Sequence, residues 1–171
     1  MEPIVHAIIP LLFLIALFPN LEKKYLLLLP IVWIIDLDSY FGYHRFYLHN
    51  IFFILTIAIL LYFIWNMRAS LVAFFFGISH LILDSAFPGV AIFYPLLKNT
   101  FYIIAGINLF PFDFDFHLGS ISLQEYISFS SSFDHSQYFG ESSLIFLFLA
   151  IILLIYKYRQ KIISYISSTN P

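Results

Sequence analysis

Long apolar runs separated by short polar breaks dominate this chain. Most of the runs are shorter than the ~20 residues that a straight membrane-spanning helix needs to cross a hydrocarbon core of ~30 Å. We therefore expect their polar ends to lie at, or dip into, a bilayer interface. The runs cover Ile4–Phe18, Tyr25–Ile35, Ile51–Trp65, Leu71–Leu83, a broken stretch Val90–Phe110, and Leu144–Tyr156.

The positions of Lys and Arg predict an orientation for these runs, because both residues are enriched on cytoplasmic loops. If the first run passes inward, all the basic residues except Arg45 and Lys98 lie on the cytoplasmic side. We therefore predict one integral membrane domain over residues 1–171 in a plasma or inner membrane. It is all-α and polytopic, with about five transmembrane helices, an external N-terminus and a cytoplasmic C-terminus. Residues 84–142 form its outer region, which includes a re-entrant or interfacial stretch at 90–110.

Two further patterns lie within the outer region. Phe112 to Leu118 alternates apolar and polar residues with a period of two, which predicts a half-buried strand. The segments Ser128–Ser132 and Ser136–Ser143 are rich in serine and are expected to be exposed loops.

Composition supports a membrane protein and excludes several function classes. Hydrophobic residues make up 61% of the chain and charged residues 11%, against about 45–50% and about 25% in soluble domains. The start of the chain has no positively charged segment, so it does not resemble a cleaved signal peptide. A net charge of −2 and no basic cluster longer than Lys23-Lys24 argue against nucleic-acid binding. The absence of cysteine leaves histidines and carboxylates as the side chains that could hold a metal.

The predicted topology brings eight ionisable side chains to the outer ends of apolar runs. Such groups are costly beside hydrocarbon unless they are paired or coordinated, so they are candidates for function. His80 and Asp84 are four residues apart and share one helical face, which suits a common metal ion. Imidazole and carboxylate together favour Zn²⁺, with Mn²⁺ or Fe²⁺ as alternatives. The eight are His6, Asp36, Asp38, His44, Arg45, His49, His80 and Asp84.

The same residues carry a resemblance to a known family. Asp36-Leu37-Asp38, then His44-Arg45-Phe46-Tyr47-Leu48-His49, then Ser79-His80-Leu81-Ile82-Leu83-Asp84 with Phe87-Pro88-Gly89 and Tyr94-Pro95 resemble the YdjM-like family of membrane-bound metal-dependent hydrolases. The resemblance covers about residues 1–95. That family is similar to the zinc-dependent phospholipase C superfamily. The similarity implies metal ligation by His6, by Asp36 or Asp38, and by His49, His80 and Asp84.

The hypothesis that follows is a membrane-embedded hydrolase of a phosphoester. We expect one or two zinc ions to activate water, and the expected substrate is a phospholipid or lipid-linked phosphate. Arg45 either clamps phosphate or forms a salt bridge with Asp36 or Asp38, and His44 is either a general acid or an outer-shell donor. A spare aspartate, Asp36 or Asp38, moves the proton.

Other readings stay open beside this one. The alternative function is a non-catalytic metal-binding membrane protein, with a structural ion or as a carrier of divalent cations. Asp113, Asp115 and His117 are most simply the wet face of the predicted strand. His135 and Glu141 do not reproduce the spacing of the soluble enzymes, so a trinuclear site is not expected.

Overall fold

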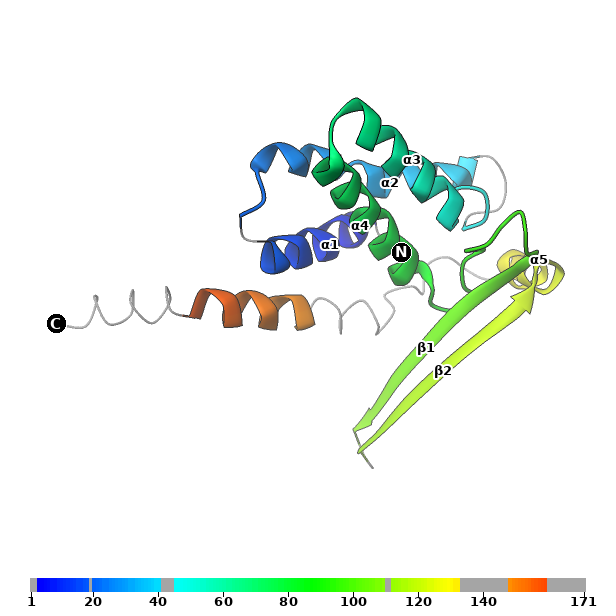
Figure 1. Cartoon of the computed structure of the whole chain (residues 1–171). Helices are drawn as coiled ribbons and strands as arrows, with labels where there is room; N and C mark the ends of the chain where they lie inside the picture. Colours follow the sequence, from blue (N-terminus) through cyan, green and yellow to red (C-terminus); the bar gives the residue numbers. More distant parts are fainter. Residues whose placement is uncertain (1–2, 19, 41–44, 110–111, 133–147, 160–171) are drawn as a thin grey trace.

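The computed structural model describes residues 3–18, 20–40, 45–109, 112–132 and 148–159, and Figure 1 shows their arrangement. A group of helices formed by the first half of the chain is followed by one long β-hairpin and a short helix. The elements are α1 (Pro3–Leu17), the 3₁₀ helix η1 (Lys23–Leu28), α2 (Ile31–Ile35), the 3₁₀ helix η2 (Asp36–Tyr40), α3 (Ile51–Ile64), α4 (Met67–Asp84), β1 (Asn99–Leu109), β2 (Phe112–Ser122) and α5 (Leu123–Ser132). Residues 148–159 are also helical.

Helix α4 is the centre of the helical group, because α1, η1, α2 and α3 all pack against it. It begins at Met67 since the preceding Asn66 caps it, accepting a hydrogen bond from the amide of Ala69 at 2.9 Å. Gly77 allows α3 to approach closely: a Cβ atom added there would lie 2.7 Å from Cγ2 of Ile54. The side chain of Asn66 therefore defines the start of α4, and the absence of a side chain at Gly77 allows α3 to pack against it.

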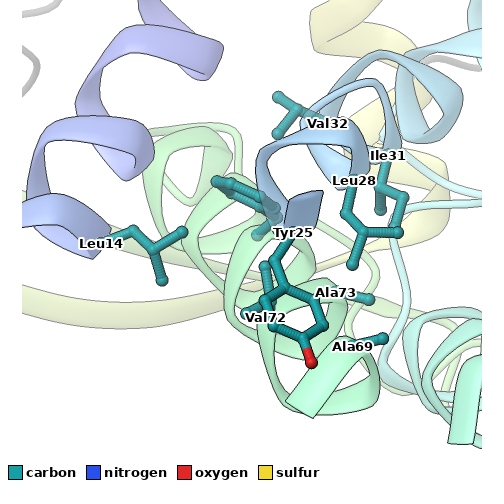
Figure 2. Close-up of a cluster of buried hydrophobic side chains, with 9 residues drawn as sticks. Leu14, Tyr25, Leu28, Ile31, Val32, Ala69, Val72 and Ala73 are labelled. Atoms are coloured by element: carbon teal, nitrogen blue, oxygen red, sulfur yellow. The ribbon is translucent and has the colours of Figure 1, made fainter. Parts of the chain in front are cut away.

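The main hydrophobic core lies between α4, α1, η1 and α2, and Figure 2 shows its side chains converging. Leu14 comes from α1, Tyr25 from η1 and Val32 from α2, and each is almost fully buried. Small residues of α4 let these larger side chains approach its backbone. The buried cluster is Leu14, Tyr25, Leu28, Ile31, Val32, Ala69, Val72, Ala73 and Phe76.

The side chain of Lys157 joins the helix at 148–159 to α1. The ammonium of Lys157 donates hydrogen bonds to the carbonyls of Ile15 at 2.6 Å and Ala16 at 2.7 Å. These carbonyls belong to the last turn of α1, whose backbone has no helical donor for them. A cation there also interacts favourably with the helix dipole.

The prediction of a strand at Phe112–Leu118 is confirmed, because these residues belong to β2. The prediction of a re-entrant or interfacial stretch at 90–110 is wrong. Residues 99–109 form β1, which pairs antiparallel with β2 from Asn99↔Ser122 to Leu109↔Phe112. The base of this hairpin is tied to the end of α4, because the amide of Ile103 donates to the carbonyl of Ser85 at 2.7 Å. The strand forms because its pairing partner follows directly along the chain.

The prediction of exposed loop at Ser128–Ser132 is also wrong, since these residues end helix α5. Ser122 and Glu125 form a capping box at its start. The Glu125 carboxylate accepts from the Ser122 amide at 2.8 Å, and the Glu125 amide donates to the Ser122 hydroxyl at 3.3 Å. The other serine-rich segment, 136–143, lies outside the described residues.

The prediction of an all-α protein with about five transmembrane helices is wrong. Among the described residues, only α4, with 18 residues, is long and apolar enough to cross a membrane by length and composition. The apolar helices Val5–Leu17 and Ile51–Ile64 are shorter. The predicted run Tyr25–Ile35 is not one helix, because Pro30 separates η1 from α2 and lacks the amide hydrogen that a continuous helix needs.

Candidate metal centre

Four side chains from three separate segments converge beside the end of α4. Asp36 begins η2, His49 lies just before α3, and His80 and Asp84 belong to the last turns of α4. Each offers one ligand atom, and these atoms all lie within 4.8 Å of one another. The group could bind a metal ion.

The shortest distances within this cluster join ring nitrogens and carboxylate oxygens. Without a cation between them, the two nitrogens would repel each other or compete for one proton. Nε2 of His80 lies 3.1 Å from Nε2 of His49. Oδ2 of Asp84 lies 3.0 Å from Nε2 of His49 and 3.2 Å from Nε2 of His80. Oδ1 of Asp36 closes the group at 3.3 Å from Nε2 of His80. Four ligand atoms that lie within 4.8 Å of one another are close enough to share one metal ion.

Local structure explains how each ligand reaches this point. The four-residue spacing of His80 and Asp84 places both on one face of α4. Asp36 stands at the junction where α2 ends at Ile35 and the chain tightens into η2. His49 is fixed by its neighbour Asn50, whose side chain caps α3 by accepting from the amide of Phe53 at 2.8 Å.

Asp38 lies behind His49 rather than in the cluster. Its fully buried Oδ2 accepts hydrogen bonds from Nδ1 of His49 at 2.7 Å, from the Phe46 amide at 3.1 Å and from the Leu48 amide at 3.4 Å. Because a carboxylate only accepts, Nδ1 of His49 carries a proton, and in the neutral imidazole the Nε2 lone pair would face the cluster. This carboxylate–histidine pair is the usual support of a metal-binding imidazole.

The second oxygen of Asp84 faces Arg45 and His6. Oδ1 of Asp84 lies 3.2 Å from Nη2 of Arg45 and 3.1 Å from Nε2 of His6. Nη1 of Arg45 donates to the carbonyl of Ala86 at 3.3 Å. Arg45 has a backbone φ of 68°, in the left-handed region that costs a non-glycine residue about 1–3 kcal/mol. The ion-pair partner that the structure shows for Arg45 is therefore Asp84.

Several buried polar atoms at the centre have no hydrogen-bond partner among the described residues. They are Nδ1 and Nε2 of His6, Nδ1 of His80 and Oδ1 of Asp84. The contacts of Asp84 Oδ1 with Arg45 and His6 are thus close ion-pair distances without hydrogen-bond geometry. A buried polar atom without a partner costs about 1–3 kcal/mol. None of these four atoms is among the facing ligand atoms of the cluster, so only a cation between His6 and Asp84 would reach two of them, Nε2 and Oδ1.

The charges also fit a divalent ion. Asp36, Asp38 and Asp84 contribute three negative charges, and Arg45 contributes one positive charge. With neutral imidazoles, the two remaining negative charges equal the charge of one divalent cation. Buried charges are tolerated when they are paired or coordinate a metal.

The pKa values of the ligands outside α4 show the same demand for positive charge. Burial alone would lower the pKa of His49, but hydrogen bonds to Asp36, Asp38 and Asp84 outweigh it and raise the pKa to about 10. Burial alone would raise the pKa of Asp36, but hydrogen bonds from His49 and His80 hold that pKa well below its usual range. A proton on the imidazole thus occupies the electrostatic place of a metal ion.

The remaining candidates lie elsewhere. Asp115 and His117 pair with each other at 2.9 Å, on exposed positions of β2. Asp113 is also in β2. His44, His135 and Glu141 lie outside the described residues. One contributor, the carbonyl of Ala86 that accepts a hydrogen bond from Arg45, could not be predicted from the sequence, because a backbone atom has no signature in a motif.

Comparisons with known proteins do not identify the chain. No family model matches it, and no curated protein or solved structure matches it either. The resemblance to YdjM-like hydrolases stays a prediction, and what is established is a cluster of Asp36, His49, His80 and Asp84 that could bind a metal ion.

Proposed function

We propose that this protein is a membrane-embedded, metal-dependent hydrolase that cleaves a phosphoester with metal-activated water. The observation that carries the proposal is the cluster of two imidazoles and two carboxylates at the end of α4. Zinc is the preferred ion, since mixed nitrogen and oxygen ligands suit it, and Mn²⁺ or Fe²⁺ also accept such a set.

The uneven burial of the ligands supports catalysis. The side chains of His49, His80 and Asp84 are 0% exposed, whereas that of Asp36 is 24% exposed. Water can therefore approach from the side of Asp36. Catalytic sites keep one open position of this kind, whereas structural sites are closed. When bound, a divalent ion supplies an acidified water and polarises a phosphoryl oxygen.

The residues of the chain have separate tasks in this proposal. Asp38 holds the tautomer and orientation of His49. Arg45 holds Asp84 by its outer oxygen, which leaves Oδ2 free to face the cluster. His6 is a ligand for a second ion on that outer oxygen, because its unpartnered Nε2 lies 3.1 Å from it. In the hydrolysis, the water oxygen forms the new bond to phosphorus, the bond from phosphorus to the alkoxide breaks, and the proton that the water loses ends on that alkoxide.

Exposed apolar side chains support a membrane location. Leu27 is 74% exposed, and Phe63 and Ile64 at the end of α3 are each 78% exposed. Exposed apolar side chains that gather into a patch mark an interaction with lipid or protein, and Phe63 and Ile64 are adjacent. The 18 residues of α4 extend about 27 Å, close to the ~30 Å hydrocarbon core. We place the N-terminus and the metal centre outside, at headgroup level, and the C-terminus in the cytoplasm. Because a centre at this depth meets lipid headgroups, a phospholipid or lipid-linked phosphate is the proposed substrate.

A structural ion is the second candidate, and the complete burial of three of the four ligands favours it. A carrier of divalent cations is less well supported. Transport sites lie near the middle of the membrane on broken helices, whereas this cluster lies at one end of α4.

Metal content and turnover, measured on the same samples, test the proposal. The detergent-purified wild type is compared with His80→Ala and with His117→Ala, which removes an exposed histidine of β2. We expect one or two zinc ions per chain and hydrolysis of a chromogenic phosphodiester or of phospholipid vesicles. Both are lost in His80→Ala and kept in His117→Ala. Zinc without turnover in the wild type would favour the structural ion, and the absence of bound metal would refute the site.

A further inference from the structure

A second feature of α4 is an apolar groove on the side away from the metal centre. The groove has a volume of about 680 Å³ and is walled by α1, η1 and α4. On α4 its lining includes Leu71, Phe75, Ile78 and Ile82, which recur every three or four residues and so form one stripe. At 3.6 residues per turn, His80 projects from the opposite side of the helix. The groove and the metal centre are therefore separate sites.

The length of the groove matches the hydrocarbon depth of one membrane leaflet. Leu71 and Ile82 are eleven residues apart in α4, which corresponds to about 16 Å. Half of a ~30 Å hydrocarbon core is about 15 Å. The volume of the groove lies within the range of about 300–1,000 Å³ that is usual for ligand sites. An extended acyl chain fits this length and this lining.

The polar end of the groove carries a net positive charge. Glu22 pairs with Lys24 at 2.7 Å and with Arg68 at 3.3 Å, so two cations share one carboxylate. Arg68, Glu22 and Asn20 line the groove itself. All three charged side chains are exposed and can rearrange at little cost, because exposed ion pairs are weak. A guanidinium in this position is suited to a phosphate group.

We propose that this groove binds one anionic phospholipid, with an acyl chain along α4 and its phosphate at Arg68 and Lys24. The proposal rests on the membrane location argued above but not on hydrolase activity. Arg68 stands in the first turn of α4 and Asp84 is its last residue, so the bound phosphate lies at the end of the helix opposite to the metal centre. The lipid is thus a resident ligand and not the substrate.

Native mass spectrometry in detergent tests this proposal, with phosphatidylglycerol and phosphatidylcholine as the added probes. We expect the wild type to retain one phosphatidylglycerol per chain, at least tenfold in preference to phosphatidylcholine. Leu71→Trp fills the groove and should abolish retention of both lipids. Leu60→Trp makes the same change on the exposed side of α3 and should behave as the wild type. Arg68→Gln should remove the preference for the anionic lipid.

Three results would overturn the proposal. The first is equal retention of the two lipids by the wild type. The second is retention by Leu71→Trp equal to that of Leu60→Trp. The third is a dimer without bound lipid, which would mean that a second copy of the chain covers the groove. Zinc content measured on the same samples separates this proposal from the previous one. Leu71→Trp is expected to keep its metal while it loses lipid.

Discussion

Replacing Asp38 by asparagine tests whether the metal centre depends on a residue that does not touch the ion. The oxygen of Asp38 that faces His49 accepts three hydrogen bonds, from Nδ1 of His49 at 2.7 Å and from two backbone amides. An amide oxygen in the same place can accept all three, so Asp38→Asn changes the charge and leaves the shape. Hydrogen bonds to ionised groups are about twice as strong as neutral ones. The imidazole therefore becomes less basic and less firmly oriented.

The expected magnitude follows from similar outer-shell partners, whose loss lowers metal affinity about 10–100-fold. At about 1.4 kcal/mol for each factor of ten, this is about 1.4–2.8 kcal/mol. Competition with a chromogenic zinc chelator measures the affinity. Asp115→Asn is the matched control, because Asp115 also pairs with a histidine, His117, but on the exposed surface of β2. Unchanged zinc affinity in Asp38→Asn, or an equal loss in Asp115→Asn, would refute the reasoning.

Three further predictions concern pH, capping and packing. In metal-free protein the pKa of His49 is about 10, whereas in the unfolded chain it is about 6.5. Protonation of His49 therefore stabilises the fold fully below about pH 6.5, and this stabilisation is lost as the pH rises toward 10. We expect the Tm of the chelator-treated protein to fall across that window more steeply than that of zinc-loaded protein, and parallel curves would show that His49 is not a ligand. Asn66→Ala removes the cap of α4 and the acceptor of the Tyr25 hydroxyl, which should cost about 1 kcal/mol in denaturant unfolding, whereas Asn66→Asp should keep most of the stability. Gly77→Ala places a methyl group against Cγ2 and Cγ1 of Ile54 and should cost about 1–3 kcal/mol. The same change in an Ile54→Ala background, which lacks both atoms, should cost less if the contact is the cause.

The sequence predicts those parts of the centre that depend on local spacing. His80 and Asp84 share a face because four residues make about one helical turn. The choice between Asp36 and Asp38 was beyond such reasoning. The two residues lie two positions apart in η2, and the direction of each side chain depends on the tight turn that begins after Ile35. The ion pair of Arg45 with Asp84 was likewise hidden, since it rests on a left-handed backbone conformation at Arg45.

The hairpin shows a similar limit. In β2, apolar residues alternate with Asp113, Asp115 and His117, which revealed the strand. In β1 the run Phe101-Tyr102-Ile103-Ile104 has no such alternation, because apolar residues occupy both faces. Pairing with β2 decided its structure, and hydropathy alone could not. Helix α5 did have a local signal, the capping pair Ser122 and Glu125, although the serines that follow suggested a loop.

The separation of the metal ligands along the chain has a consequence for folding. Asp36 and Asp84 are 48 positions apart, and the segment between them includes all of α3. An ion held by both would act as a cross-link that closes this loop and restricts the unfolded chain, as a disulfide does. The chain contains no cysteine and has no covalent means to the same end. Removal of the ion would then free the segment before α3 from α4 and restore the entropy of an open loop to the unfolded state.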